Sequence, residues 1–268
     1  MIMNFNEKII LGRTNLSVGR LGLASSYGAP AAAFEEAFEK GCNYFVWNTF
    51  MKGRSNEMLT AIRNIIKKGQ REKIVIAMHS YGHNAMLNRI FLQRSLKALG
   101  TDYIDVMLLG YYNWRPSQWV LNGAQNLKEK HYVRYIGITG HNRSLVPRLD
   151  KERIIDVFHV RYNAVHRGAE NDIFPYLDSN NKPGIVSFTA TRWGQLLDQS
   201  KMPPGEAPPS AADCYRFVLS HLSVDVTLTG PKTLEQMREN LNTLALGPMN
   251  EEELARMRKI GDYIYKKK

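Results

Sequence analysis

The stretch that decides the fold is Tyr135–Arg161, which reads YIGITGHNRSLVPRLDKERIIDVFHVR. It opens with a short apolar run, Tyr135–Thr139, and closes with a second one, Val157–Arg161. Between them lies a segment near Ser144–Leu149 with a helical pattern. Two β-rich runs joined by a helical segment are typical of a βαβ unit, whose two strands are parallel. The stretch therefore predicts part of a parallel sheet.

The same alternation continues in both directions along the chain. The expected strands are Arg20–Ala24, Tyr44–Asn48, Ile74–Met78, Tyr103–Leu109, Tyr135–Thr139, Val157–Arg161, Gly184–Phe188 and Val226–Leu228. The expected helices are Ala31–Lys40, Ser55–Lys68 with Ser55 as its cap, Met86–Leu99, Ser117–Lys130, Ser144–Leu149, Asp172–Asp178, Ala211–Leu222 and Thr233–Leu244. Eight strands alternating with eight helices predict an α/β fold, a parallel (β/α)8 TIM barrel.

Two further elements flank this barrel. A turn signal between Ile9–Leu11 and Leu16–Val18 predicts an N-terminal β-hairpin. Glu251–Tyr265 predicts an extra C-terminal helix. We find no change in composition that would divide the chain, so we expect residues 1–268 to form a single domain. The length of 268 residues agrees with the roughly 250 that such a barrel needs.

Composition narrows the class of protein. Hydrophobic residues make up 44% and charged residues 23%, and no apolar run approaches the roughly 20 residues of a membrane span. The start lacks the pattern of a signal peptide, and two cysteines are too few for a disulfide framework, so we expect a cytoplasmic protein. The net charge of +11 is interpreted as surface charge. No aromatic residues are interleaved with the lysine clusters, so we expect no nucleic-acid partner.

Function on a parallel barrel lies where the strands end at their carboxyl side. His79, Tyr111 and His159 occupy such positions and are our candidate catalytic residues. An imidazole titrates near neutrality and suits acid–base chemistry, whereas the plainer interpretation is a hydrogen-bonded strand-end residue. A zinc site formed by His79, His141 and His159 is disfavoured, because their spacing is no metal motif. Possible anion binders are Arg54, Arg161, Arg167 and Arg192.

A set of short motifs appears in a characteristic order. They are Gly41–Phe45, Gly53–Glu57, Asp102–Asp105, Ile136–His141, Tyr162–Asn163 and His166–Glu170. With these motifs the chain resembles the aldo-keto reductases over nearly its whole length. The resemblance implies the barrel that the alternation predicts, together with carbonyl reduction dependent on NADP(H).

The chain departs from this family at the catalytic tetrad of Asp, Tyr, Lys and His. The matching positions hold Val46, Met51, His79 and Gly110. In the family the tyrosine donates a proton to the carbonyl oxygen, and losing a positioned acid typically costs about 10²–10⁴ in rate. Of the four residues here, only His79 can carry a proton near neutral pH.

The cofactor positions are better preserved. The resemblance implies that Phe188 stacks on the nicotinamide, Thr139 contacts its carboxamide, Thr189 contacts a phosphate and Asn240 contacts the adenine. His159 replaces the expected carboxamide-binding Gln. Thr233 and Gln236 read as a capping box, whose free helix N–H groups with Lys232 suit a phosphate. The plainer interpretation is an ordinary helix cap.

Three functions stay open at this point. The first is a noncanonical NADP-dependent oxidoreductase that uses His79. The second is a non-redox enzyme, such as a dehydratase, isomerase or cyclase, that uses His79, His159 and Tyr111. The third is a non-catalytic protein that binds a ligand or partner. A small molecule at the barrel mouth is expected in each case, and the oligomeric state is left open.

Overall fold

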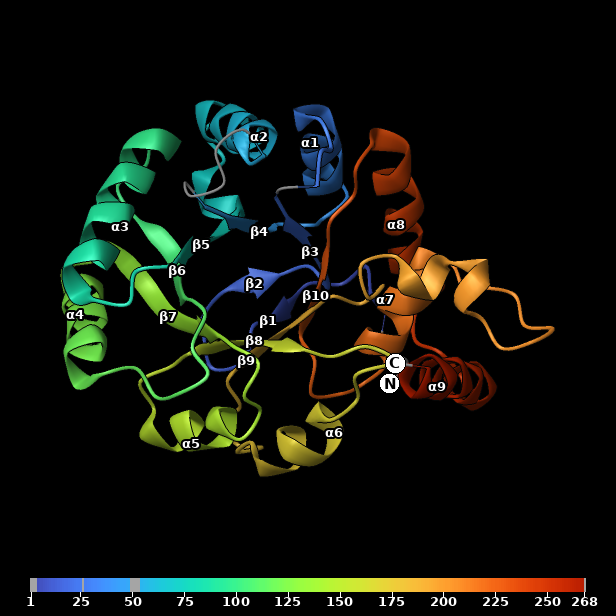
Figure 1. The fold of residues 1–268 in the computed structure, drawn as a ribbon. Coiled ribbons are helices and arrows are strands. Elements are labelled where there is room, and N and C mark those ends of the chain that lie inside the picture. Colours follow the sequence, from blue (N-terminus) through green and yellow to red (C-terminus); the bar gives the residue numbers. More distant parts are fainter. Residues whose placement is uncertain (1–3, 26, 49–53, 268) are drawn as a thin grey trace.

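The computed structural model describes residues 4–25, 27–48 and 54–267, and within them eight parallel strands close into a barrel (Figure 1). Around the barrel the strands follow the order β10-β3-β4-β5-β6-β7-β8-β9. Their bounds are β3 Leu21–Ala24, β4 Tyr44–Trp47, β5 Val75–Ser80, β6 Ile104–Leu109, β7 Val133–Thr139, β8 Val157–Arg161, β9 Gly184–Phe188 and β10 Val226–Thr229. This confirms the predicted (β/α)8 TIM barrel.

Helices surround the barrel, and in the described part of the chain none is long and apolar enough to cross a membrane. They are α1 Ala31–Glu39, α2 Asn56–Lys67, α3 Ala85–Leu99, α4 Gln118–Glu129, α5 Leu145–Glu152, α6 Ala169–Asp172, α7 Ala211–Leu219, α8 Leu234–Leu246 and α9 Glu251–Lys266. Short 3-10 turns lie at Arg71–Lys73, Phe174–Tyr176, Gln195–Leu197 and Gln199–Lys201. The last helix, α9, is the predicted C-terminal addition.

Two local predictions were wrong. The helix expected at Asp172–Asp178 instead begins at Ala169 and ends at Asp172, and a 3-10 turn that contains Pro175 follows it. Proline has no backbone N–H, so it cannot continue an α-helix. Ser55 precedes α2 as expected, but its side chain does not cap the helix. Its Oγ instead donates to Ser25 Oγ at 3.1 Å, which ties α2 to the end of β3.

Side chains from alternate residues of the strands fill the inside of the barrel. Tyr44, Val106, Val157, Val186 and Val226 are among these inward side chains and are buried. The predicted hairpin, β1 Ile9–Ile10 paired antiparallel with β2 Ser17–Val18, supplies Leu11, Leu16 and Val18 to the same cluster. The barrel interior is therefore a packed core, so a ligand of the barrel is expected at its mouth.

Three aspartates, two of them buried and Asp156 half-buried, join neighbouring strands at the amino-terminal end of the barrel. Asp105, Asp156 and Asp225 each accept a hydrogen bond of 2.8–2.9 Å from a backbone N–H of an adjacent strand. Each also pairs with a cation, at 2.9 Å to Arg71, 2.8 Å to Lys128 and 2.7 Å to Lys182 respectively. Such charge-assisted contacts at the lower end support stability and leave the upper end for function.

We predict that Asp105→Ala lowers the free energy of unfolding by about 3 kcal/mol, because it leaves the largely buried Arg71 without its carboxylate. Urea denaturation of the purified protein measures this loss. The matched control is Asp178→Ala, which removes a more exposed carboxylate paired with Arg153 and should cost less than about 1 kcal/mol. Equal losses in the two variants would show that the aspartate at β6 does not hold the barrel together.

Candidate functional site

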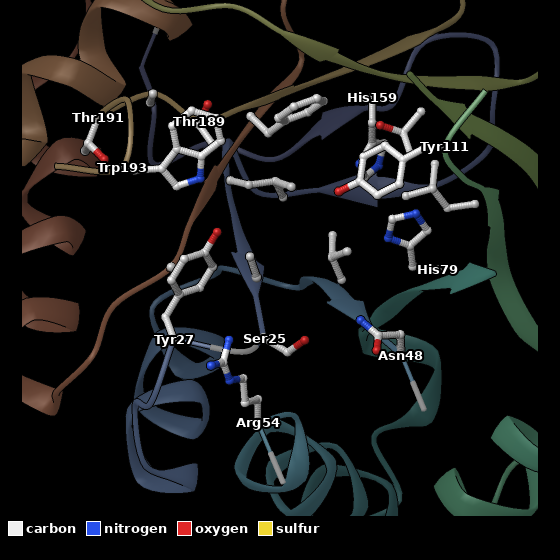
Figure 2. Close-up of a pocket in the computed structure, with 18 of the residues that line it drawn as sticks. Ser25, Tyr27, Asn48, Arg54, His79, Tyr111, His159, Thr189, Thr191 and Trp193 are labelled. Atoms are coloured by element: carbon white, nitrogen blue, oxygen red, sulfur yellow. The ribbon is translucent and has the colours of Figure 1, made fainter. Parts of the chain in front are cut away.

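A cavity of about 400 Å³ opens at the carboxyl ends of the barrel strands (Figure 2). All the residues expected to be catalytic, His79, Tyr111 and His159, line it. Its other lining residues include Thr139, Phe188 and Thr189 from the expected cofactor group. The structure thus brings these six positions from five different strands and their following loops to one place.

His79 lies at the end of β5, with its ring stacked on Tyr81 at 4.2 Å between centroids. Its Nε2 atom is shielded from solvent and has no hydrogen-bond partner. Gly110 explains this position, because a Cβ atom added there would lie 1.9 Å from that Nε2 atom. The imidazole therefore occupies space that any side chain at residue 110 would need.

The site holds His79 as a neutral imidazole. Burial lowers its pKa to about 4 from the ordinary 6.5. At neutral pH the ring keeps one N–H group and one free lone pair. It is therefore suited to donate a hydrogen bond to a carbonyl oxygen rather than to act as a cationic acid. Neutral histidine serves as an electrophile of this kind in other enzymes.

His159 is also neutral, and a second buried residue holds it. His159 is only 4% exposed. Its Nε2 atom lies 2.8 Å from the hydroxyl of Tyr44 inside the barrel. Burial and the nearby His79 lower the pKa of His159 to about 3, and burial raises the pKa of Tyr44. This favours a contact with a ligand over an acid–base role for His159.

The Tyr44 contact also selects the tautomer of His159. If Nε2 donated the hydrogen bond, the buried hydroxyl hydrogen of Tyr44 would have no acceptor, which typically costs about 1–3 kcal/mol. The tyrosine therefore donates, and Nε2 accepts. The proton of the neutral imidazole then resides on Nδ1, the nitrogen left for a ligand. His159 offers the cavity a fixed N–H donor.

Aromatic rings form one continuous wall of the cavity. Tyr111 is half-exposed, and its ring centroid lies 5.5 Å from that of His79 and 6.0 Å from that of His141. His141 in turn lies 6.0 Å from Phe188, and Tyr81 closes the other end of the row. Flat rings at such spacings suit contact with another planar group. The wall thus favours an aromatic or nicotinamide ligand.

The remaining expected cofactor residues, Lys232, Thr233, Gln236 and Asn240, are not among the lining residues of this cavity and lie just before and within α8. Lys232 is exposed, and its N–H donates to Gln236 Oε1 at 2.9 Å. Thr233 Oγ1 accepts from the Gln236 N–H at 3.2 Å. The predicted capping box is therefore wrong in one half, because the glutamine reaches back to Lys232 instead of Thr233. Asn240 is buried, and its amide donates to Thr229 Oγ1 at 2.8 Å.

The tetrad positions can be compared with the cavity lining. Val46 and His79 line the cavity, Gly110 lies against His79, and Met51 falls outside the described residues. Among the described lining residues there are tyrosines but no lysine, aspartate or glutamate. No tyrosine–lysine pair is thus assembled from described residues elsewhere in the chain. In the same residues no cluster of histidine, cysteine and carboxylate groups could hold a metal.

Sequence reasoning missed several lining residues. Ser25 and Tyr27 follow β3, so the rule about strand ends could have identified them. Arg54, which the sequence offered as a possible anion binder, precedes α2 and also lines the cavity. Trp193 could not have been identified, because it reaches the rim through a turn in the left-handed region. The φ angles of Arg192, Trp193 and Gly194 are 50°, 53° and 85°. Figure 2 shows Trp193 beside Thr189, across the cavity from Arg54.

Comparisons with known proteins agree with this geometry. A model of the aldo/keto reductase family matches residues 8–210. Norsolorinic acid reductase A of Aspergillus parasiticus is 23% identical over 205 residues, which are 65% of this chain and 52% of that protein. The match thus spans about half the length of this curated relative.

Solved structures show the same fold. The holo form of aldo-keto reductase AKR11C1 from Bacillus halodurans superposes with a TM-score of 0.77 at 21% identity, covering 95% of this chain and 96% of that one. The apo form gives a TM-score of 0.77 at 20% identity, with 95% of each chain covered. At this identity the likeness concerns the fold alone.

We predict that Tyr44→Phe removes the preference of His159 for a single tautomer. In ¹⁵N-labelled native protein at neutral pH, the His159 nitrogens should show the proton on Nδ1 and a hydrogen-bonded Nε2. The variant should show a mixture of tautomers, because the phenyl ring cannot donate. Tyr132→Phe, at an exposed tyrosine, should leave the spectrum unchanged. A proton on Nε2 of the native protein would contradict the assigned direction of the hydrogen bond.

We also predict that stability falls as pH drops below about 6.5. The folded-state pKa values of about 4 for His79 and about 3 for His159 lie below the unfolded value. Between the folded and unfolded pKa values, the unfolded chain binds protons that the folded chain does not. The free energy of unfolding therefore falls by about 1.4 kcal/mol for each group with every pH unit of acidification. Urea unfolding at pH 6.5, 5.5 and 4.5 should show a shallower decline in His79→Gln than in the native protein. His131→Gln, at an exposed position, is the control, and identical slopes in all three would refute the assignment.

Proposed function

The chain belongs to the aldo/keto reductase family, and from this premise we propose that it binds NADP(H) at the barrel mouth and reduces a carbonyl group without the tetrad of that family. The reduction would depend on neutral donors in place of an ionic network. An aromatic aldehyde or ketone is the expected substrate, since an aromatic wall lines the cavity. The relative named norsolorinic acid reductase A supports a reductase of this type.

The residues present suit the nicotinamide end of NADP(H). Phe188 offers a ring for stacking, and Thr139 and the Nδ1–H of His159 offer polar contacts. Thr189 Oγ1 is shielded from solvent and has no hydrogen-bond partner, which is consistent with a position that a ligand completes. At the other end the exposed Lys232 and the first turn of α8 suit a phosphate.

The observation that carries the proposal is the packing of His79 against Gly110. A side chain at residue 110 and the imidazole of His79 cannot occupy this space together, because the Cβ would lie 1.9 Å from Nε2. The resemblance places the family's histidine at residue 110. The imidazole of His79 therefore fills the space in which that side chain would begin, and an imidazole remains at the mouth despite the loss of the tetrad.

The chain's own residues can then be given roles. When bound, NADPH supplies the hydride. His79, which is neutral, donates a hydrogen bond to the carbonyl oxygen as negative charge builds there. Tyr111 lies against His79 at the exposed rim and is the hydroxyl that we assign to deliver the proton, with replacement from solvent. His159, held by Tyr44, orients the ligand at the base of the cavity.

We predict that the protein quenches or shifts NADPH fluorescence on titration and oxidises NADPH with an aromatic aldehyde such as 4-nitrobenzaldehyde. His79→Gln should lower kcat by about 10²–10³, the usual effect of losing one oxyanion donor, with little change in NADPH affinity. Gly110→Ala should lower kcat in a similar way by displacing the imidazole. The double variant His79→Ala/Gly110→Ala should lose no more than His79→Ala alone and should regain stability relative to Gly110→Ala.

The outcomes separate the three functions. NADPH binding with an unchanged kcat in His79→Gln would contradict the role of His79. Absence of NADPH binding would remove the oxidoreductase and leave the non-redox enzyme, if substrate loss depends on His79 or His159. Binding without turnover, unaffected by either substitution, would identify a non-catalytic binding protein. Arg238→Gln, at an exposed arginine paired with Glu36 on α1, serves as a control for handling effects.

A further inference from the structure

Arg161 and Arg192 differ from the arginines around them because neither pairs with a carboxylate in the described part of the chain. Nearby, Arg143 binds Asp172 at 2.5 Å and Arg167 binds Asp262 at 2.6 Å. Arg161 is the last residue of β8 and lies in register with Phe188 of β9. Arg192 lies four residues beyond Phe188, in the loop that follows β9. The two arginines therefore belong to one corner of the barrel mouth.

Arg192 is buried, and none of the carboxylates in residues 4–25, 27–48 and 54–267 pairs with it. Only 5% of its surface is exposed, and its Nη1 atom is shielded from solvent with no hydrogen-bond partner. Burial and the positive charge of Arg161 lower the pKa of the Arg192 guanidinium. A buried guanidinium is costly unless an anion and hydrogen-bond acceptors surround it. Two such groups in proximity add mutual repulsion to that cost.

The backbone holds Arg192 in this position. Its φ angle of 50° and that of Trp193, 53°, lie in the left-handed region, which is unfavourable for residues other than glycine. The turn is closed by the Arg192 N–H, which donates to the Thr189 carbonyl at 2.9 Å. Strained backbone of this kind concentrates at ligand-binding positions. The flanking residues Thr191 and Trp193 both line the cavity.

Other groups at this corner also lack what an anion would provide. The hydroxyl oxygen of Thr189 is shielded and without a partner. The charge of Arg161, together with burial, lowers the pKa of His141, and both residues line one small cleft beside the main cavity. The described residues that line this cleft and the cavity include no aspartate or glutamate. Hydrogen-bond donors and positive charge thus lie together at this corner, where the described lining residues offer no carboxylate to pair with them.

We propose that Arg161 and Arg192, with the hydroxyl of Thr189, form a binding site for an oxyanion at the ends of β8 and β9. The ligand group is a phosphate or a carboxylate, because a guanidinium matches the paired oxygens of both. An anion there would replace the absent carboxylates and relieve the repulsion between the two guanidinium groups. This site does not depend on the proposed reduction, since it needs neither His79 nor a hydride donor.

The test measures inorganic phosphate binding by calorimetry and by the melting temperature of the full chain. The native protein should bind phosphate and melt about 3 °C higher at ten times Kd. Arg192→Gln and Arg161→Gln should each weaken phosphate binding at least tenfold. In the absence of phosphate, Arg192→Gln should melt no lower than the native protein, because a costly buried charge is removed. Arg167→Gln, at a nearby arginine already paired with Asp262, is the matched control and should bind phosphate as the native protein does.

Two further arms identify the source of the oxyanion. If it is a phosphate of the cofactor, NADP⁺ should compete with phosphate and bind at least tenfold more weakly to Arg192→Gln. If it belongs to a substrate or free anion, phosphate or benzoate should bind equally well with NADP⁺ present. Either result supports the site, and phosphate binding without any NADP⁺ binding would preserve it while refuting the proposed cofactor. Equal phosphate affinity in the native protein and both arginine variants, or no phosphate binding at all, would overturn the proposal.

Discussion

Closure of the sheet between its first and last strands is the constraint on which the rest of the molecule depends. β3 and β10 pair in parallel through Leu21 with Thr227 and Leu23 with Thr229. Gly22 lies at this seam, where a Cβ would come within 2.9 Å of the Val226 and Leu228 side chains. Because the ring is closed, strand ends far apart in sequence share one small mouth. His79, His159 and Arg161 meet there only because the sheet has no edges.

The fold could be predicted from sequence because the alternation of strand and helix patterns is repeated eight times. The site, in contrast, depends on single contacts between residues far apart in the chain. Apart from the sixth helix, the predicted element bounds agree with the structure within three residues. Alternation also placed His79 and His159 at the mouth. It could not show that His79 needs the empty space at Gly110, or that Tyr44 holds His159, because these partners are 31 and 115 residues apart. The left-handed turn at Trp193 was equally hidden, since neither residue before Gly194 favours it.

The four substitutions that the resemblance implies at the tetrad positions are physically coherent. A buried lysine kept without its aspartate, or the reverse, would be an unpaired charge of several kcal/mol cost. Val46 and His79 avoid this cost, since one is apolar and burial keeps the other neutral. In the proposed reaction, donors that remain neutral over a wide pH range take the place of the family's ionic network. Such donors polarise an oxygen through an N–H or O–H group that is present over that whole range.

The mouth keeps positive charge as well, because Arg54 lines the cavity and Arg161 and Arg192 lie at and just beyond the ends of β8 and β9. A neutral imidazole binds oxygen through its N–H dipole and exerts little pull on a ligand in solution. Arg161 and Arg192 supply long-range attraction, because no carboxylate in the described residues cancels them and the chain as a whole carries +11. Attraction by the arginines and orientation by the imidazoles are separable tasks, since one depends on net charge and the other on tautomer. A ligand that is anionic at one end and carries a carbonyl or amide oxygen at the other would use both, and the distance between these groups would decide how it lies across the aromatic wall.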